Sequence, residues 1–193
     1  GVEDGRECNG ALLVRRSGWG GWMIEGDSAR AAALAQNYAR FRARLRTLQR
    51  MVDAETIVML FAELGVPSQF DLLSIDIDGN DYWVWNALQG YRPRVFVIEF
   101  NIAFPPPARW VMAYNPEHRW DGTSYYGASL SSLHDLGEQL GYALIGTDCN
   151  LVNAFFLRTD LLAASGFIQV RPEDVYHYPP SFPRHPYRPG PYV

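Results

Sequence analysis

Three aspartates follow an apolar run in the segment LLSIDIDGNDYW, residues 72–83. Carboxylates next to residues that favour burial need water, a cation or hydrogen-bond donors. An EF-hand calcium loop that starts at Asp76 would need Gly at its sixth position and Glu at its twelfth. Those positions hold Asp81 and Ala87, so that kind of site is excluded. Two interpretations stay open: the acids serve a ligand at a strand end, or Asp78 and Asp81 cap the next helix.

A second apolar run, RVFVIEFN, ends with Glu99 and Asn101. Adjacent parallel strands lie about 5 Å apart, so their carboxyl ends bring such side chains together. Carboxylate and carbonyl oxygens are the ligands that Mg²⁺ prefers. Asp78, with Asp76 as its alternative, therefore forms the predicted metal site together with Glu99 and Asn101.

The same strand ends supply candidates for a general base. Asp78 and Glu99 are preferred, acting directly or by holding a metal that lowers the pKa of a substrate hydroxyl. His118, in an aromatic loop segment, and His134, on a predicted helix, are the alternatives. A histidine in the middle of a helix more often has a structural role, so His118 is the third catalytic candidate.

A glycine-containing turn, GVEDG, opens the sequence, and Glu25 follows Gly5 by about 20 residues, the spacing of a ribose-binding acid. The negative charge of Glu3 suits a cationic cofactor such as S-adenosylmethionine better than the pyrophosphate of NAD. An NAD enzyme is also disfavoured because the turn lacks a full GxGxxG. The alternative is an ordinary acidic turn.

The composition indicates a globular protein. The chain has 193 residues, 48% of them hydrophobic, and a net charge of -4, which argues against nucleic acid as a partner. Cys8 and Cys149 form no cysteine cluster, so reduced thiols and a cytoplasmic location are expected. No apolar run approaches the length of a membrane span.

Periodicity predicts an α/β fold, largely parallel, with a C-terminal antiparallel hairpin. Asp27 or Ser28 should cap one helix and Asp53 another. Residues 102–127 have no clear period and are expected to be an insertion that forms a lid or substrate wall. The predicted strands are residues 21–24, 45–52, 70–75, 94–100, 142–147 and 152–158, and the predicted helices are residues 9–17, 28–38, 54–64, 81–88 and 129–140.

The chain resembles the FkbM-type family of class I S-adenosylmethionine-dependent methyltransferases. The resemblance is carried by IEGDSARAAALAQNY, FDLLSIDIDGNDYWVWNAL, PRVFVIEFN and GASLSSLHDLGEQLGYALIGTDCNLVNAFFLR. It implies a Rossmann-like domain over residues 1–160 whose central first strand precedes Gly1 and is missing from the given chain. It also implies that Gly1, Glu3 and Gly5 form the cofactor turn, Glu25 holds the ribose, Asp53 lies near the adenine and Asp76 near the methionine end.

The expected activity is therefore S-adenosylmethionine-dependent O-methylation, with Mg²⁺ as an additional cofactor. The segment WDGTSYYGAS, residues 120–129, combines rings and hydroxyls that suit a small, carbohydrate-like acceptor, such as a sugar or a glycosylated or polyketide-like metabolite. Residues 161–193 form a tail, proline- and aromatic-rich from Tyr176, that wraps the domain or meets a protein partner or second copy. The alternative is an inactive scaffold subunit with the same fold.

Overall fold

The computed structural model describes residues 2–177 and 190–193. The chain divides into two compact units between Val52 and Asp53, and each unit combines helices with a β-sheet. None of the described helices is long and apolar enough to cross a membrane.

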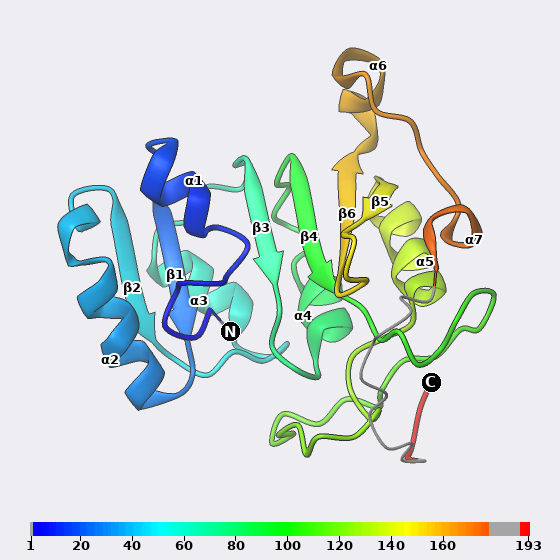
Figure 1. Cartoon of the computed structure of the whole chain (residues 1–193), viewed down its shortest axis with the longest axis horizontal. Coiled ribbons are helices and arrows are strands. Elements are labelled where there is room, and N and C mark those ends of the chain that lie inside the picture. The colour runs from blue at the N-terminus through cyan, green and yellow to red at the C-terminus, as the bar shows by residue number, and fades with distance from the viewer. Residues whose placement is uncertain (1, 178–189) are drawn as a thin grey trace. The chain divides into compact units, whose positions relative to one another are not determined.

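The first unit contains two parallel strands and the helices around them (Figure 1). The predicted helix after residue 27 is confirmed, because the Asp27 side chain accepts the Arg30 N–H at 2.8 Å and caps it. Leu34 and Tyr38 pack with Met23 in the core of this unit. The elements are α1 (Ala11–Arg16), β1 (Gly21–Glu25), α2 (Ser28–Asn37), the 3₁₀ turn η1 (Ala39–Phe41) and β2 (Leu45–Gln49).

The second unit has a mixed four-stranded sheet in the order β3-β4-β6-β5. Strands β3 and β4 are parallel, whereas β6 runs antiparallel to both β4 and β5, so the predicted C-terminal hairpin is confirmed. The elements are α3 (Ile57–Glu63), β3 (Leu72–Ile75), α4 (Asp81–Ala87), β4 (Val95–Glu99), α5 (Leu130–Leu140), β5 (Tyr142–Thr147), β6 (Asn153–Arg158), the 3₁₀ turn η2 (Thr159–Leu161), α6 (Leu162–Ser165) and α7 (Pro172–Val175).

Aromatic side chains form the core of the second unit. The ring of Trp85, on α4, contacts Phe96 and Phe156, which are directly paired across β4 and β6. Gly137 brings α5 close to the same rings, since a Cβ there would lie 2.9 Å from Phe156. Trp85 is therefore a core residue, which fixes α4 against the sheet.

Helix α3 begins three residues later than predicted. Asp53 was expected to cap a helix that starts at residue 54, but the residue before α3 is Thr56, whose side chain makes no capping bond. The Asp53 carboxylate instead accepts the N–H groups of Glu55 and Thr56 and the Thr56 hydroxyl. It closes a turn ahead of the helix.

The insertion, residues 102–127, pairs with the residue that follows it and with the end of the chain. Val111 pairs with Ala128, and Met112 pairs with Tyr192. The Tyr125 hydroxyl donates to the Pro191 carbonyl at 2.7 Å. The last four residues of the chain, which end the expected tail, therefore contact the insertion. Helix α7 lies in the part of that tail that precedes residue 178.

Candidate active site

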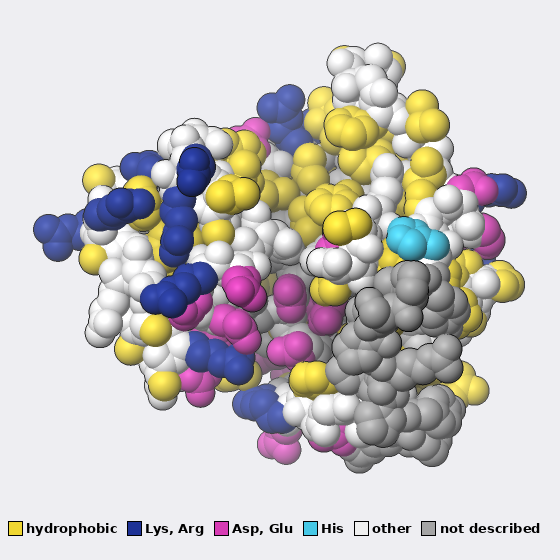
Figure 2. Space-filling view, in the orientation of Figure 1, with side chains coloured by type: hydrophobic (Ala, Val, Ile, Leu, Met, Phe, Trp, Pro, Cys, Tyr) yellow, Lys and Arg dark blue, Asp and Glu magenta, His cyan; other side chains and the backbone are white. Residues whose placement is uncertain are grey.

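Three carboxylates meet at the carboxyl ends of β3 and β4. Ile75 pairs with Ile98, so Asp76 and Glu99 follow at the same edge of the sheet. One oxygen each of Asp76, Asp78 and Glu99 lies within 4.8 Å of the others. The two strands run side by side in Figure 1, and Figure 2 shows acidic side chains at the surface over their ends. The predicted proximity of Asp78 and Glu99 is confirmed.

A fourth acid, Asp81, shapes the turn that carries Asp78. Asp81 is fully buried, and its carboxylate accepts the N–H groups of Ile77 at 2.9 Å and Gly79 at 3.0 Å. Asp78 has a left-handed backbone (φ 55°), which aspartate tolerates better than most residues. The N-cap residue of α4 is Asn80, whose side chain makes no capping bond, and the Asp81 carboxylate binds N–H groups ahead of the helix, so the capping role considered for Asp78 and Asp81 is wrong. Asp81 binds the turn before the helix.

Burial and mutual repulsion perturb this group of acids. Burial, followed by the charges of Asp81, Asp76 and Asp78, raises the pKa of Glu99 well above its ordinary value. Burial also raises the pKa of Asp81, although its two N–H donors oppose that shift. The Glu99 Oε2 atom is buried and accepts no hydrogen bond from the described residues. Such a group is suited to bind a proton or a cation.

The donor set fits a hard divalent cation, which prefers carboxylate oxygens. Its members are Asp76, Asp78 and Glu99, and they are the one His, Cys, Asp or Glu group in the described residues with this spacing. Asn101 has other contacts: its amide donates to the carbonyls of Ser124 and Tyr126, and its oxygen accepts the Ala103 N–H. Asn101 thus anchors the insertion.

His118 lies beside the same turn. Its ring packs so closely on Gly79, the residue after Asp78, that a Cβ at Gly79 would overlap it. The Tyr125 ring meets the His118 ring edge-on, with centroids 6.0 Å apart. The structure therefore brings the three catalytic candidates Asp78, Glu99 and His118 to one end of the sheet.

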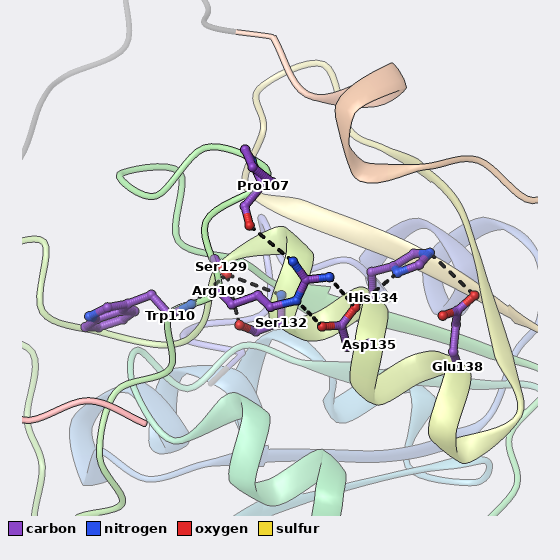
Figure 3. A network of polar contacts seen from close by, with 8 residues as sticks. All are labelled: Pro107, Arg109, Trp110, Ser129, Ser132, His134, Asp135 and Glu138. Carbon is purple, nitrogen blue, oxygen red and sulfur yellow. Dashed lines mark hydrogen bonds and ion pairs between the residues drawn. The ribbon is translucent and has the colours of Figure 1, made fainter.

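His134 lies elsewhere, in a polar network on α5 (Figure 3). Its ring nitrogens are 3.6 Å from Asp135 Oδ1 and 3.8 Å from Glu138 Oε1. Arg109, from the insertion, donates to both Asp135 oxygens, at 2.6 and 3.2 Å. This network joins the insertion to α5, which agrees with a structural role for His134.

In the first unit, the glycine turn touches the acid at the end of β1. The Glu3 N–H donates to Glu25 Oε2 at 2.7 Å, and the Asp27 N–H donates to Oε1 at 2.9 Å. Glu25 is buried, and each oxygen retains a lone pair for another donor, such as a ribose hydroxyl. The turn and the acid at the end of β1 are therefore in direct contact. Gly1, also assigned to the turn, lies outside the described residues.

The sequence assigned Gly5 to the cofactor turn, and the structure adds a packing reason for a glycine at this position. Its φ of 75° favours glycine, and a Cβ at this position would lie 2.5 Å from the Tyr38 ring and 2.6 Å from Leu34. The Gly5 N–H donates to the Val2 carbonyl, and its carbonyl accepts the Tyr38 hydroxyl. Gly5 therefore packs the turn onto α2.

Tyr126 was missed, because nothing in the sequence shows that the insertion returns to β4. Burial and the nearby carboxylates, first Glu99, raise the pKa of its hydroxyl.

A scan against known protein families finds no family that matches the chain, and a search of curated proteins finds no similar sequence.

Proposed function

We propose that the chain is an S-adenosylmethionine-dependent O-methyltransferase with a Rossmann-like fold that modifies a hydroxyl of a sugar or glycosylated metabolite. The observation that carries the proposal is the convergence of Asp76, Asp78 and Glu99 at the ends of β3 and β4, with His118 packed on the same turn. Ligands of open α/β sheets bind at the carboxyl ends of strands.

Two further features support a cofactor of this class. The hydrogen bond from Glu3 to Glu25 unites the turn with the proposed ribose acceptor. The consecutive antiparallel strands β5 and β6 are a C-terminal hairpin of the kind that the family resemblance implies. When bound, S-adenosylmethionine supplies a methyl group made electrophilic by its sulfonium.

The residues of the second unit would handle the proton of the acceptor hydroxyl. We assign Glu99 Oε2 as the proton acceptor. Its raised pKa makes this carboxylate more basic than an ordinary glutamate, which suits a general base that works near neutral pH. Asp78 and His118 are its alternatives. The buried Asp81 fixes the turn, so the acids are held in place before the acceptor arrives.

The same carboxylates can act through a cation. Asp76, Asp78 and Glu99 would hold Mg²⁺, and a bound cation lowers the pKa of a hydroxyl that contacts it. In that case His118 is the remaining base, since Glu99 is occupied. Methyl transfer that survives EDTA would exclude a role for the cation and leave Glu99, Asp78 and His118 as proton acceptors, whereas transfer that needs Mg²⁺ would leave His118.

Calorimetric titration of S-adenosylhomocysteine into the protein tests the cofactor. We expect saturable binding, and Glu25→Gln should weaken it about tenfold because an amide replaces a charged acceptor of ribose hydroxyls. Arg30, which pairs with the exposed Glu3, offers a control: Arg30→Gln should change the affinity little. No detectable binding to the unaltered chain would exclude the proposed function.

A further inference from the structure

One aromatic residue of the insertion stands apart from the others. Trp120 is 42% exposed, whereas Trp110 and Tyr126 are each 7% exposed. It is the one exposed aromatic side chain in residues 102–127. The other rings of the segment are buried or half-buried, so Trp120 is the ring of the insertion with the largest area available to a ligand.

The Trp120 ring is also fixed. Its indole N–H donates to the Thr123 carbonyl at 2.7 Å, and the Asp121 carboxylate accepts both the N–H and the hydroxyl of Thr123. Gly122 completes this tight turn with a φ of 83°. Because the indole N–H is satisfied within the turn, the rest of the ring is apolar contact area held in one orientation.

Trp120 is linked to the end of strand β4 through Tyr126. Its ring meets Tyr126 edge-on, with centroids 6.3 Å apart. The Tyr126 carbonyl accepts the side-chain amide of Asn101, two residues after Glu99, at 2.7 Å. Two residues before Trp120, His118 packs on Gly79, next to Asp78.

We propose that Trp120 is the stacking platform for the acceptor and that the acceptor is a saccharide, whose C–H face lies on the indole while its hydroxyls reach the Asp76, Asp78 and Glu99 group. A pyranose combines an apolar face with hydroxyls along its edge, and both kinds of surface are supplied here by neighbouring groups. This assignment rests on the proposed function, to which it adds the residue that holds the saccharide acceptor.

A quaternary ammonium ligand is the main alternative, because it too binds indole faces next to negative charge. Cages for such ligands surround the cation with several exposed rings. The insertion exposes one ring, since Tyr126 is buried and Tyr125 is half-buried with its hydroxyl on Pro191. A single flat face fits a saccharide ring better.

The test uses ¹⁹F NMR of the protein labelled with 5-fluorotryptophan. The Trp120 resonance is assigned as the one lost in Trp120→Phe, and the probes are methyl glycosides of glucose, galactose and rhamnose, added with and without MgCl₂. We expect at least one glycoside to shift the Trp120 resonance saturably. Its affinity, measured by calorimetry, should fall about tenfold in Trp120→Ala and stay within about threefold in Trp120→Phe.

Trp19, which is 38% exposed in the first unit, provides the matched control, and Trp19→Ala should leave glycoside affinity unchanged. Circular dichroism and S-adenosylhomocysteine affinity establish that Trp120→Ala is folded. The inference is overturned if no glycoside shifts the resonance, if Trp120→Ala binds the glycoside as tightly as the unaltered chain, or if tetramethylammonium replaces the glycosides as the ligand.

The two proposals fail separately. Binding of S-adenosylhomocysteine without any glycoside contact at Trp120 rejects the platform and leaves the methyltransferase proposal. Glycoside binding that depends on Trp120, without any cofactor affinity, rejects the methyltransferase and leaves a saccharide-binding protein.

Discussion

Asp81 and Gly79 are joined by a buried hydrogen bond of 3.0 Å, in which the Gly79 N–H donates to the Asp81 carboxylate. The other carboxylate oxygen binds the Ile77 N–H, so one fully buried side chain holds the turn around Asp78 from both sides. This contact accounts for the left-handed backbone of Asp78 and for the placement of its side chain beside Glu99.

The first prediction concerns Asp81→Ala. This change leaves two buried N–H donors without an acceptor, and we expect the free energy of unfolding to fall by about 2 kcal/mol or more. Urea denaturation measures the loss. Asp71→Ala is the control, because Asp71 pairs with Arg94 at the surface and its removal should cost about 0–1 kcal/mol. Equal stability of the two variants would contradict the role given to Asp81.

The second prediction compares two glycines of the first unit with nearly the same backbone angle. Gly5 has a φ of 75° and Gly18 a φ of 76°, but only at Gly5 would a Cβ meet other atoms within 4 Å. Alanine at either position incurs backbone strain of about 1–2 kcal/mol. Alanine at Gly5 should add about 1–3 kcal/mol of overpacking against Tyr38 and Leu34. Thermal denaturation of both variants separates the two effects, and equal losses would refute the packing role.

The third prediction uses two serines of helix α5 and its cap. The Ser129 Oγ accepts the N–H groups of Trp110 and Ser132, whereas the Ser131 Oγ is buried with no hydrogen-bond partner in the described residues. Ser129→Ala should therefore lower the unfolding free energy by about 1–3 kcal/mol. Ser131→Ala should be neutral or stabilising, because it removes an unpaired hydroxyl. A larger loss at Ser131 than at Ser129 would reverse this interpretation.

The fourth prediction concerns the pH dependence of thiol reactivity. Both cysteines are free, and burial raises the pKa of the Cys8 thiol. A raised pKa leaves less of the Cys8 thiol as thiolate at a given pH than in an ordinary cysteine. The rate of Cys8 alkylation should therefore rise with pH, but at higher pH values than for an ordinary thiol. We expect iodoacetamide to modify the exposed Cys149 first at pH 8. Mass spectrometry of Cys149→Ser and Cys8→Ser variants gives each rate, and faster labelling of Cys8 would contradict its burial.

The order of elements in the fold was predictable because its signals are local. The apolar run before Asp76 and the Asp27 cap depend on neighbours in sequence, and both appear as expected. The meeting of Asp78 and Glu99 was also predictable, since parallel strands align their carboxyl ends.

The contacts that complete the candidate site were not predictable, because they join distant segments. Asn101 follows a strand exactly as a metal ligand would, yet its amide reaches carbonyls 23 and 25 residues later. The burial of Asp81 has no sequence signal either, since an acid in the first turn of a helix is usually exposed. The contacts of Asn101 depend on how residues 102–127 fold back to the end of β4.

Asn101 and Ser129 together close the base of the insertion. Asn101 binds Ser124 and Tyr126 from the strand side, and Ser129 binds Trp110 from the helix side. Further hydrogen bonds, from Asn80 to Asn115 and from Trp83 to Met112, join the middle of the insertion to the turn before α4 and to α4 itself. The insertion is therefore tied to the second unit along its length, and a substitution that breaks one of these contacts is expected to disturb the strand ends as well as the loop.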